Sequence, residues 1–147
     1  MKMSEPEDKR PKVGIGLLIV RGNSVLLGKR KGSHGAGEFG GPGGHLEGTE
    51  SFENCIMREL DEEVGGKLKI SGLRFLCVTN LTKYLPKHYV DIGMIAEWKS
   101  GEPIVGEGEK LESWGWYDLD KLPDPLFGCV ENYIEAYRTQ RVYFSTS

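Results

Sequence analysis

Apolar residues recur along the chain with two different periods, and this pattern predicts a mixed α/β protein. Residues 13–20 form a short apolar run, VGIGLLIV, and residues 24–30 resume it as SVLLGKR after the turn signal at 21–23. Two such runs around a short turn are typical of a β-hairpin. Three more strand-like segments follow, at residues 69–81, 88–98 and 113–119.

Two further segments have the period of an amphipathic helix. Residues 51–64 contain no Gly or Pro, and Gly65 and Gly66 follow as a stop signal. The apolar positions of this segment lie three and four residues apart, at Phe52, Cys55, Ile56, Leu60 and Val64. The second helix is predicted over residues 127–139. Strands mixed with two helices favour an α/β sandwich with a mixed sheet, without specifying its topology.

The remaining segments are expected to be loops. Residues 31–44 contain seven glycines and predict a loop with at most a short extended piece. Residues 101–112 form an acidic loop, and residues 120–126 a turn region.

Length and charge limit the kind of protein. With 147 residues, the chain fits one domain, which we place at residues 11–147 after a loose, flexible tail at 1–10. The net charge of −3 disfavours a nucleic-acid polymer as the main partner. No apolar run approaches the ~20 residues of a membrane span, and the charged start is unlike a secretory signal. We therefore expect neither membrane nor polymer binding.

The cysteines indicate a reducing compartment. The chain contains three, Cys55, Cys77 and Cys129, with no CxxC spacing. An odd number without such spacing disfavours a disulfide framework or a zinc site, so a cytoplasmic protein is expected. Cys55 and Cys77 are predicted to be buried, small apolar residues.

Three carboxylates crowd the first predicted helix. Glu59, Glu62 and Glu63 are spaced i, i+3 and i+4, so they lie close together on the helix surface and repel one another. They also lie in the last turns, where the helix dipole favours cations. A bound Mg²⁺ or Mn²⁺ would relieve both penalties, and such ions commonly meet phosphate substrates. The alternative is a solvated acidic face; the preceding glycine loop, which can bring backbone groups close to an ion, favours the metal site.

These residues resemble the Nudix signature, G-x5-E-x7-R-E-U-x-E-E-x-G-U, in which U is a bulky aliphatic residue. The matching positions are Gly44, Glu50, Arg58, Glu59, Leu60, Glu62, Glu63 and Gly65. Only Gly66 departs, because an aliphatic residue is expected there. Residues 12–127 more broadly resemble the MutT-like nucleotide-pool enzymes of eukaryotes, including the thiopurine-nucleotide diphosphatase and its plant relatives.

The resemblance implies a Nudix α/β/α sandwich with a central mixed sheet and a loop–helix–loop catalytic motif. It implies hydrolysis of a nucleoside diphosphate linked to another moiety, X, and we expect a (d)NTP to give (d)NMP and pyrophosphate. By resemblance, Glu59 and Glu63 are the main Mg²⁺ ligands, joined by Glu62 and the Gly43 carbonyl. The resemblance also implies that one of these glutamates, most often the one matching Glu59, helps to deprotonate the attacking water.

Arg58 is implied to orient a catalytic glutamate and loop carbonyls, and an i,i+4 ion pair with Glu62 is the simpler interpretation of the same spacing. Glu50 is expected to be structural. Glu109 and Glu112 are candidates for a further metal ligand, with an exposed acidic loop as the alternative.

Substrate-binding residues are less strongly indicated. Lys29 and Arg30, followed by Lys31, are candidates for the outer phosphates, and His45 is another; exposed surface positions are the alternative. Asp91 could accept a hydrogen bond from an amino group of guanine or cytosine, or could be an ordinary acid at a strand end. Phe127 could stack on a base or belong to the core.

Other functions remain open at this point. Tyr84 lies near the place where diadenosine-polyphosphate hydrolases carry a tyrosine, and Pro86 near the proline of ADP-ribose hydrolases, so dinucleotides, ADP-ribose and nucleotide sugars are the second substrate class. A non-catalytic nucleotide-binding module is a third hypothesis, disfavoured because all three glutamates are present. Relatives dimerise, and a homodimer is expected.

Overall fold

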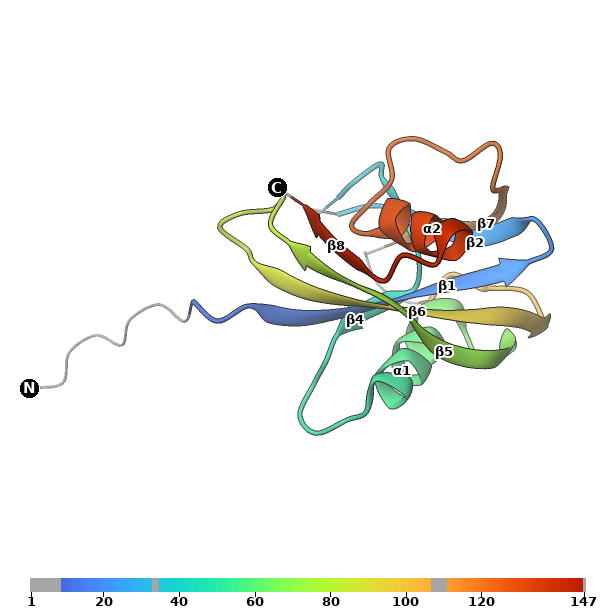
Figure 1. Cartoon of the computed structure of the whole chain (residues 1–147). Helices are drawn as coiled ribbons and strands as arrows, with labels where there is room; N and C mark the ends of the chain where they lie inside the picture. The colour runs from blue at the N-terminus through green and yellow to red at the C-terminus, as the bar shows by residue number, and fades with distance from the viewer. Residues whose placement is uncertain (1–8, 33–34, 107–110, 147) are drawn as a thin grey trace, which may run out of the picture.

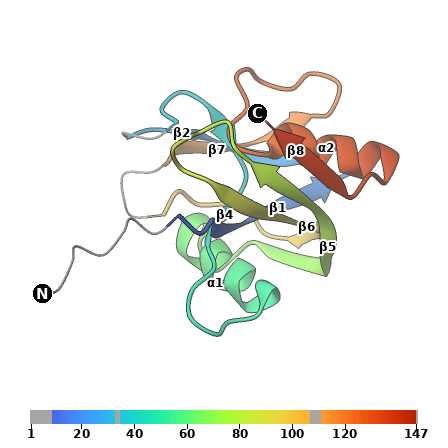
Figure 2. The same ribbon diagram turned by 60° about the vertical axis from the view of Figure 1, so that its left-hand side comes forward.

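One mixed β-sheet lies between two helices. The computed structural model describes residues 9–32, 35–106 and 111–146. Helix α1 (Phe52–Val64) covers one face of the sheet and helix α2 (Val130–Thr139) the other (Figures 1 and 2). This arrangement confirms the predicted α/β/α sandwich.

The sheet has the order β3-β2-β1-β6-β5-β8, with β4 paired to β1 and β7 paired to β2. Pairs β1–β6 and β5–β8 are parallel, and the other pairs are antiparallel. The strands are β1 (Lys12–Arg21), β2 (Ser24–Arg30), β3 (Phe39–Gly40), β4 (Gly43–His45), β5 (Lys69–Leu81), β6 (Tyr89–Ser100), β7 (Leu111–Asp118) and β8 (Tyr143–Thr146).

Strand β1 changes partner along its length, and this change positions the glycine-rich segment that precedes α1. It pairs with β2 only at Val20 and Arg21, and with β4 at residues 14–16. Because β6 pairs with β1 over residues 12–20, β2 and β4 must share the opposite edge of β1. The glycine-rich segment therefore returns to the edge of β1 that β2 leaves free after the hairpin strands diverge.

Alternate residues of β1 supply two cores. Ile15, Leu17 and Ile19 pack on the α1 side, while Leu18 and Val20 pack on the α2 side. Successive side chains of a strand point to opposite faces, so an apolar run without alternation indicates a strand covered on both sides. The run VGIGLLIV is such a strand.

The helix boundaries follow local chemistry. The Ser51 hydroxyl accepts a hydrogen bond from the Asn54 amide at 3.0 Å and caps α1. Gly65, with φ 79°, ends α1 in a conformation that favours glycine. Helix α2 begins at Val130, three residues later than predicted, because Gly128 has φ 64° and interrupts the helix there.

The glycine-rich segment, predicted as a loop with at most one short extended piece, contributes two short strands, β3 and β4, the second of which ends at His45. Strand β8, which pairs in parallel with β5 after α2, was not predicted. All three cysteines are free and buried, which confirms the buried positions predicted for Cys55 and Cys77. Within the described residues, no helix is long and apolar enough to cross a bilayer.

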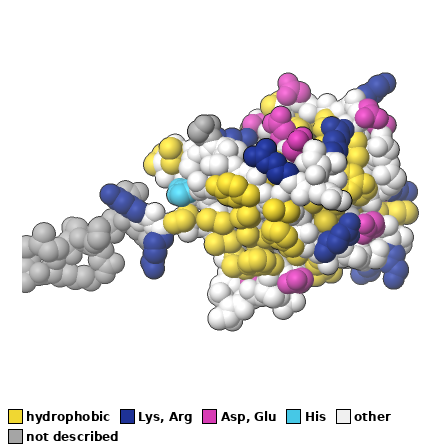
Figure 3. Space-filling view, in the orientation of Figure 1, with side chains coloured by type: hydrophobic (Ala, Val, Ile, Leu, Met, Phe, Trp, Pro, Cys, Tyr) yellow, Lys and Arg dark blue, Asp and Glu magenta, His cyan; other side chains and the backbone are white. Residues whose placement is uncertain are grey.

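An apolar area covers part of the surface over β5 and β8 (Figure 3). Exposed residues from these strands and the segment before β8 include Phe75, Val142 and Tyr143. A surface of this kind is compatible with self-association. The homodimer expected from the sequence stays a prediction.

Candidate active site

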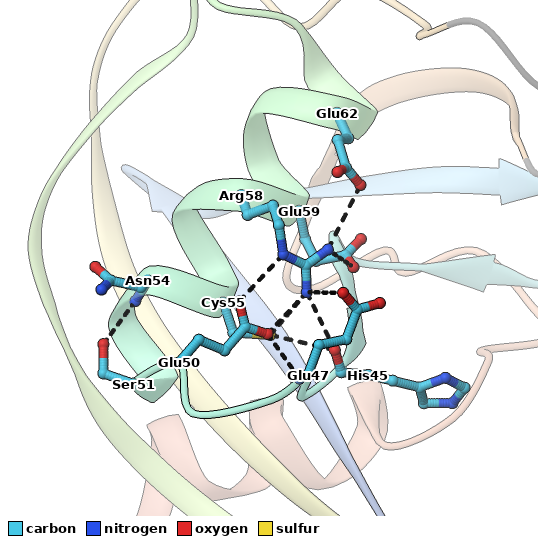
Figure 4. Close-up of polar contacts among 9 residues, drawn as sticks. All are labelled: His45, Glu47, Glu50, Ser51, Asn54, Cys55, Arg58, Glu59 and Glu62. Carbon is cyan, nitrogen blue, oxygen red and sulfur yellow. Dashed lines mark hydrogen bonds and ion pairs between the residues drawn. The ribbon is translucent and has the colours of Figure 1, made fainter.

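Arg58 organises the segment before α1 and the carboxylates of the helix (Figure 4). Its Nε and Nη2 atoms donate to the two carboxylate oxygens of Glu50 at 3.1 and 2.8 Å. Nη2 also donates to the His45 carbonyl at 3.2 Å, and Nη1 donates to Glu59 at 2.9 Å. A planar guanidinium can make these bonds together because its donors are fixed in a fork.

The orienting role expected for Arg58 stays a prediction, and the contacts of its guanidinium differ in length. The i,i+4 contact with Glu62 is present at 3.7 Å, but the contacts with Glu50 and Glu59 are shorter. The Arg58 hydrogen bonds, followed by the Glu47 amide, lower the pKa of Glu50 to about 2. Glu50 thus fixes the arginine, and the arginine fixes Glu59.

Two acidic side chains of α1 lie against the glycines of β4. Glu59 is only 6% exposed, and its carboxylate is so close to Gly44 that a Cβ at position 44 would overlap it. The Glu63 carboxylate accepts a hydrogen bond from the Gly43 amide at 3.2 Å. A Cβ at Gly43 would overlap the backbone of β1 at Ile15. Glycine at position 43 therefore lets β4 pair with β1, and glycine at position 44 leaves room for the Glu59 carboxylate.

The end of α1 is held by groups that are distant in sequence. The Glu63 carbonyl accepts hydrogen bonds from the Trp114 indole at 3.0 Å and from the Gly106 amide at 3.4 Å. The Val64 carbonyl accepts one from the Ile104 amide at 2.8 Å. These contacts satisfy carbonyls that a helix end leaves without partners. Sequence reasoning missed Trp114, since nothing in its local pattern indicates this contact.

A pocket of about 550 Å³ opens beside the carboxylates of Glu59 and Glu63. Glu59, Glu63 and His45 line it, whereas Glu62 does not and keeps 59% of its side chain exposed. The pocket is also lined by three cations, Arg30, Lys31 and Lys87. A cleft of this size with acidic and basic walls suits a small ligand that carries phosphates together with a cation.

The donor set fits a hard divalent cation. Glu59 and Glu63 offer carboxylate oxygens on one wall of the pocket. Among the described residues, no group of three His, Cys, Asp or Glu side chains is assembled as a metal cluster. Magnesium is commonly held by one or two carboxylates together with substrate phosphates and water, which two glutamates satisfy. The Gly43 carbonyl and Glu62 stay predicted ligands.

The far wall of the pocket is aromatic. The Arg30 guanidinium lies 3.8 Å from the centroid of the Phe127 ring, and Tyr84 lies 5.9 Å from it. The Tyr84 hydroxyl accepts a hydrogen bond from the Gly128 amide at 2.9 Å. Phe127 and Tyr84 both line the pocket, and Phe127 is partly buried without joining either core cluster. Burial lowers the pKa of Arg30, and nearby Glu63 opposes this effect.

Asp91 also lines the pocket, from strand β6. It accepts a hydrogen bond from the hydroxyl of Tyr133 on α2. Burial raises the pKa of Asp91 to about 6, and the Tyr133 hydrogen bond works against that rise. Tyr133 was not predicted as a site residue, because in the sequence it is only one of the apolar positions of an amphipathic helix.

The other predicted residues are placed as follows. His45 stacks on Tyr89 with ring centroids 5.6 Å apart and lines the pocket. Lys29 lies outside the pocket lining and approaches Glu112 to 4.0 Å in an exposed ion pair. Glu109, the other candidate for a further ligand, lies outside the described residues. The structure thus brings Arg30, His45, Asp91 and Phe127 together with Glu59 and Glu63, but not Lys29 or Glu112.

Comparisons with known proteins agree with this geometry. The NUDIX domain model matches residues 10–137. The chain is 37% identical to the MutT NUDIX hydrolase from Burkholderia pseudomallei, whose crystal structure superposes with a TM-score of 0.79 over 86% of this chain and 98% of that one.

Two curated relatives with different named activities have similar sequence identity to this chain. The NAD-capped RNA hydrolase NudC of Pseudomonas syringae pv. syringae is 34% identical over 128 residues, 85% of this chain and 43% of that protein. The oxidized purine nucleoside triphosphate hydrolase of Danio rerio is 32% identical over 111 residues, covering 73% and 66%. The chain spans less than half the length of the first curated relatives it matches. The signature, the fold and the match over most of its length together show that this chain belongs to the Nudix hydrolase family.

Proposed function

We propose that this chain hydrolyses the diphosphate linkage of a nucleoside diphosphate joined to another moiety, and that its substrate is a (d)NTP. Water adds to a phosphorus atom, the bond to the bridging oxygen breaks, and (d)NMP and pyrophosphate leave. The observation that carries this proposal is the placement of Glu59 and Glu63 against the glycines of β4, on the wall of a pocket large enough for a nucleotide.

Glu59 and Glu63 are the residues we assign to hold Mg²⁺, with Mn²⁺ as an alternative and with Glu62 and the Gly43 carbonyl completing the set. When bound, the ion lowers the pKa of water and neutralises phosphate charge. Without it, the acidic wall would repel a triphosphate.

Arg58 positions Glu59 and does not itself bind substrate in this proposal. Its Nη1 atom donates to one oxygen of Glu59, so the orientation of the carboxylate is set before substrate arrives. We propose that Glu59 accepts the proton that the attacking water loses. A carboxylate that is already oriented needs little reorganisation during the reaction.

The three cations around the pocket are suited to the phosphate oxygens. Arg30 is anchored by its contact with Phe127, while Lys31 and Lys87 lie on the same pocket. His45, next to β4's glycines, is a further candidate for phosphate contact. Membership of the eukaryotic nucleotide-pool subgroup is part of this proposal, supported by the resemblance to the Danio rerio enzyme.

A second candidate substrate is a dinucleotide or a nucleotide sugar, including ADP-ribose and diadenosine polyphosphates. The wall formed by Tyr84 and Phe127 favours it, because two aromatic rings could hold a second ring system. The similarity to a hydrolase of NAD-capped RNA points the same way. A non-catalytic nucleotide-binding role is the third alternative.

The test is release of pyrophosphate and phosphate with Mg²⁺ and with EDTA. The panel holds canonical and oxidised dNTPs, NTPs, ADP-ribose, nucleotide sugars and diadenosine polyphosphates. We expect Mg²⁺-dependent pyrophosphate from triphosphates, and a loss of about a hundredfold or more in kcat for Glu63→Gln. Glu135→Gln, which changes an exposed carboxylate on α2, is the control. Turnover confined to ADP-ribose or dinucleotides would show that the substrate is not a triphosphate. A folded protein that turns over no compound of the panel would support the non-catalytic, nucleotide-binding role.

A further inference from the structure

Residues 101–106, which follow β6, lie on the end of α1. The Ile104 and Gly106 amides donate to carbonyls in the last turn of the helix, at 2.8 and 3.4 Å. A Cβ at Gly106 would overlap the Glu62 carbonyl, so the two backbones are in direct contact. The segment therefore packs on the turn that carries Glu62 and Glu63, and the groups that hold the segment also support that turn.

Arg21, the last residue of β1, holds the start of this segment. Its Nη1 atom donates to the two carboxylate oxygens of Glu102, at 2.9 and 3.3 Å. Its guanidinium carbon lies 3.7 Å from the centroid of the Trp98 ring, whereas the Trp116 ring is more distant, at 5.2 Å. Contact with an aromatic ring restricts a long side chain and attracts its charge. Trp98 therefore fixes Arg21, and Arg21 fixes Glu102.

Trp98 and Gly101 connect the same region to the chain around the helix end. The Trp98 indole donates to the Gly101 carbonyl at 2.7 Å. A Cβ at Gly101 would overlap the carbonyl of Lys67, which follows the helix. Trp98 also packs against the core cluster that contains Val64 of α1. The segment is thus held at its start by β1 and β6, and it meets the helix at its end.

The last turn of α1 needs such support because its charges oppose one another. Three of the last four residues of the helix are acidic, namely Asp61, Glu62 and Glu63. Neighbouring like charges repel, and the negative end of the helix dipole adds to the repulsion. The amides of residues 101–106 satisfy carbonyls that the helix end leaves without helical partners. If the bond to Glu102 were lost, the segment would leave the turn more often, and Glu63 would be spread over more orientations.

We propose that Arg21 and Glu102 are positioning residues for the divalent cation. Their ion pair keeps residues 101–106 on the last turn of α1 and thereby keeps Glu63 oriented for the cation. This inference rests on the proposed function, because it takes the cation to lie at Glu59 and Glu63. It adds residues that govern cation affinity from outside the pocket, since neither Arg21 nor Glu102 lines it.

The ion pair of Arg74 and Glu97 offers a matched comparison. Its length is 3.0 Å and its side chains are 51% and 49% exposed, against 2.9 Å and 38% and 62% for Arg21 and Glu102. Glu97 precedes Trp98 in β6, so its side chain points to the face of the sheet away from α1. Exposed ion pairs contribute little to global stability. Loss of either pair should therefore change unfolding slightly, and only loss of the first should change cation affinity.

The test is binding of Mn²⁺ to the protein without nucleotide, followed by electron paramagnetic resonance. Glu102→Gln keeps the size of the side chain and removes the charge that Arg21 binds. We expect its Mn²⁺ dissociation constant to rise about threefold, a factor equivalent to the loss of one exposed ion pair. Glu97→Gln removes the same charge from the protein and should leave the dissociation constant unchanged.

Arg21→Gln separates positioning from long-range electrostatics. It removes a positive charge, so electrostatics alone would tighten Mn²⁺ binding. If the ion pair positions the helix, binding should instead weaken about threefold, as in Glu102→Gln. The double variant should bind no more weakly than either single variant, because both substitutions remove the same contact. Trp116→Phe keeps an aromatic ring and both hydrogen bonds from Arg21 to Glu102, so it should leave Mn²⁺ binding unchanged.

Two results would overturn the inference. One is an unchanged Mn²⁺ dissociation constant in folded Glu102→Gln, and the other is tighter Mn²⁺ binding in folded Arg21→Gln. Thermal unfolding identifies a variant that does not fold, and if one of these single variants fails to fold, the other decides the question.

Cation binding also separates this inference from the proposed hydrolysis. Mn²⁺ binding that depends on Arg21 and Glu102, without turnover of any compound in the panel, would retain the inference and reject the activity. Mg²⁺-dependent turnover with unchanged Mn²⁺ affinity in both variants would retain the activity and reject the inference. A folded wild-type protein that does not bind Mn²⁺ would contradict both the cation assignment and the inference.

Discussion

The carboxylate of Glu59 lies directly against Gly44, so a Cβ at position 44 would overlap its oxygens. The two residues come from different elements, Gly44 from β4 and Glu59 from the second turn of α1. Their contact explains why a glycine-rich segment and an acidic helix follow each other in this chain. The small residue lets the strand approach the carboxylate, and the strand then limits where the carboxylate can move.

Gly44→Ala should impair activity more than stability. The new methyl group must displace the Glu59 carboxylate, which moves it away from its bond with Arg58. We expect kcat to fall about tenfold or more, because small misplacements of a catalytic group are costly. Steady-state kinetics and thermal unfolding measure the two effects. Gly66→Ala is the control, since the nearest atom to a Cβ there is Asp61 Oδ1 at 3.5 Å; equal kinetic losses in both variants would contradict the assignment.

Trp114→Phe should loosen the end of α1. The substitution keeps an aromatic ring but removes the indole donor to the Glu63 carbonyl. We expect a loss of about 1 kcal/mol in unfolding free energy, typical of one hydrogen bond, together with a lower kcat because Glu63 is less well held. Urea unfolding and kinetics measure these effects. Trp116→Phe is the matched control, because the Trp116 indole donates to the exposed Glu102 carboxylate at 3.2 Å and not to the helix. It should leave kcat unchanged.

Glu50 should make stability dependent on pH in the acid range. Its pKa is lowered from 4.5 to about 2 in the folded protein, chiefly by Arg58. The folded state therefore binds this proton less readily, so the stabilisation is complete above pH 4.5 and is lost as pH falls towards 2. Glu50→Gln should flatten the pH dependence of the melting temperature over this range. Glu53→Gln, in the exposed first turn of α1, should not, and an unchanged slope in Glu50→Gln would show that the bond with Arg58 contributes nothing.

Asp91 should reduce stability at neutral pH. Burial raises its pKa from 3.8 to about 6, so the folded state holds the proton more tightly than the unfolded chain does. Stability consequently falls as pH rises from about 4 to 6, and this loss persists at higher pH. Asp91→Asn removes the partly buried charge and keeps an acceptor for Tyr133. We expect it to raise the unfolding free energy at pH 7.5 by on the order of 2–3 kcal/mol, measured by urea unfolding. A destabilised Asp91→Asn would instead indicate a structural role.

Local patterns predicted the elements well where period and turn signals agree. The helix at 51–64 and the hairpin of β1 and β2 follow from spacing and from Gly, Asn and Ser at their ends. The start of α2 could not be predicted in the same way. Apolar spacing continues back to Phe127, but the positive φ of Gly128 breaks the helix, and an amino-acid sequence does not reveal which φ a glycine adopts.

The short strands escaped prediction for a different reason. β4 has only three residues, and its pairing with β1 depends on the place where β2 leaves the edge of β1. β8 is defined by its parallel pairing with β5, more than sixty positions earlier in the chain. Strands of this length are stabilised by their partners rather than by their own composition.

The sequence by itself determined the carboxylates, the glycines before them and Arg58, because neighbouring positions of a helix and its preceding loop stay close in any fold of this chain. It thereby determined the family. Only the tertiary structure decided that Glu59 and Glu63 line the pocket while Glu62 does not, that Trp114 holds the helix end, and that Tyr133 meets Asp91 across the sheet. Those relationships join residues tens of positions apart, and only the packing of the helices against the register of β1, β4 and β6 creates them.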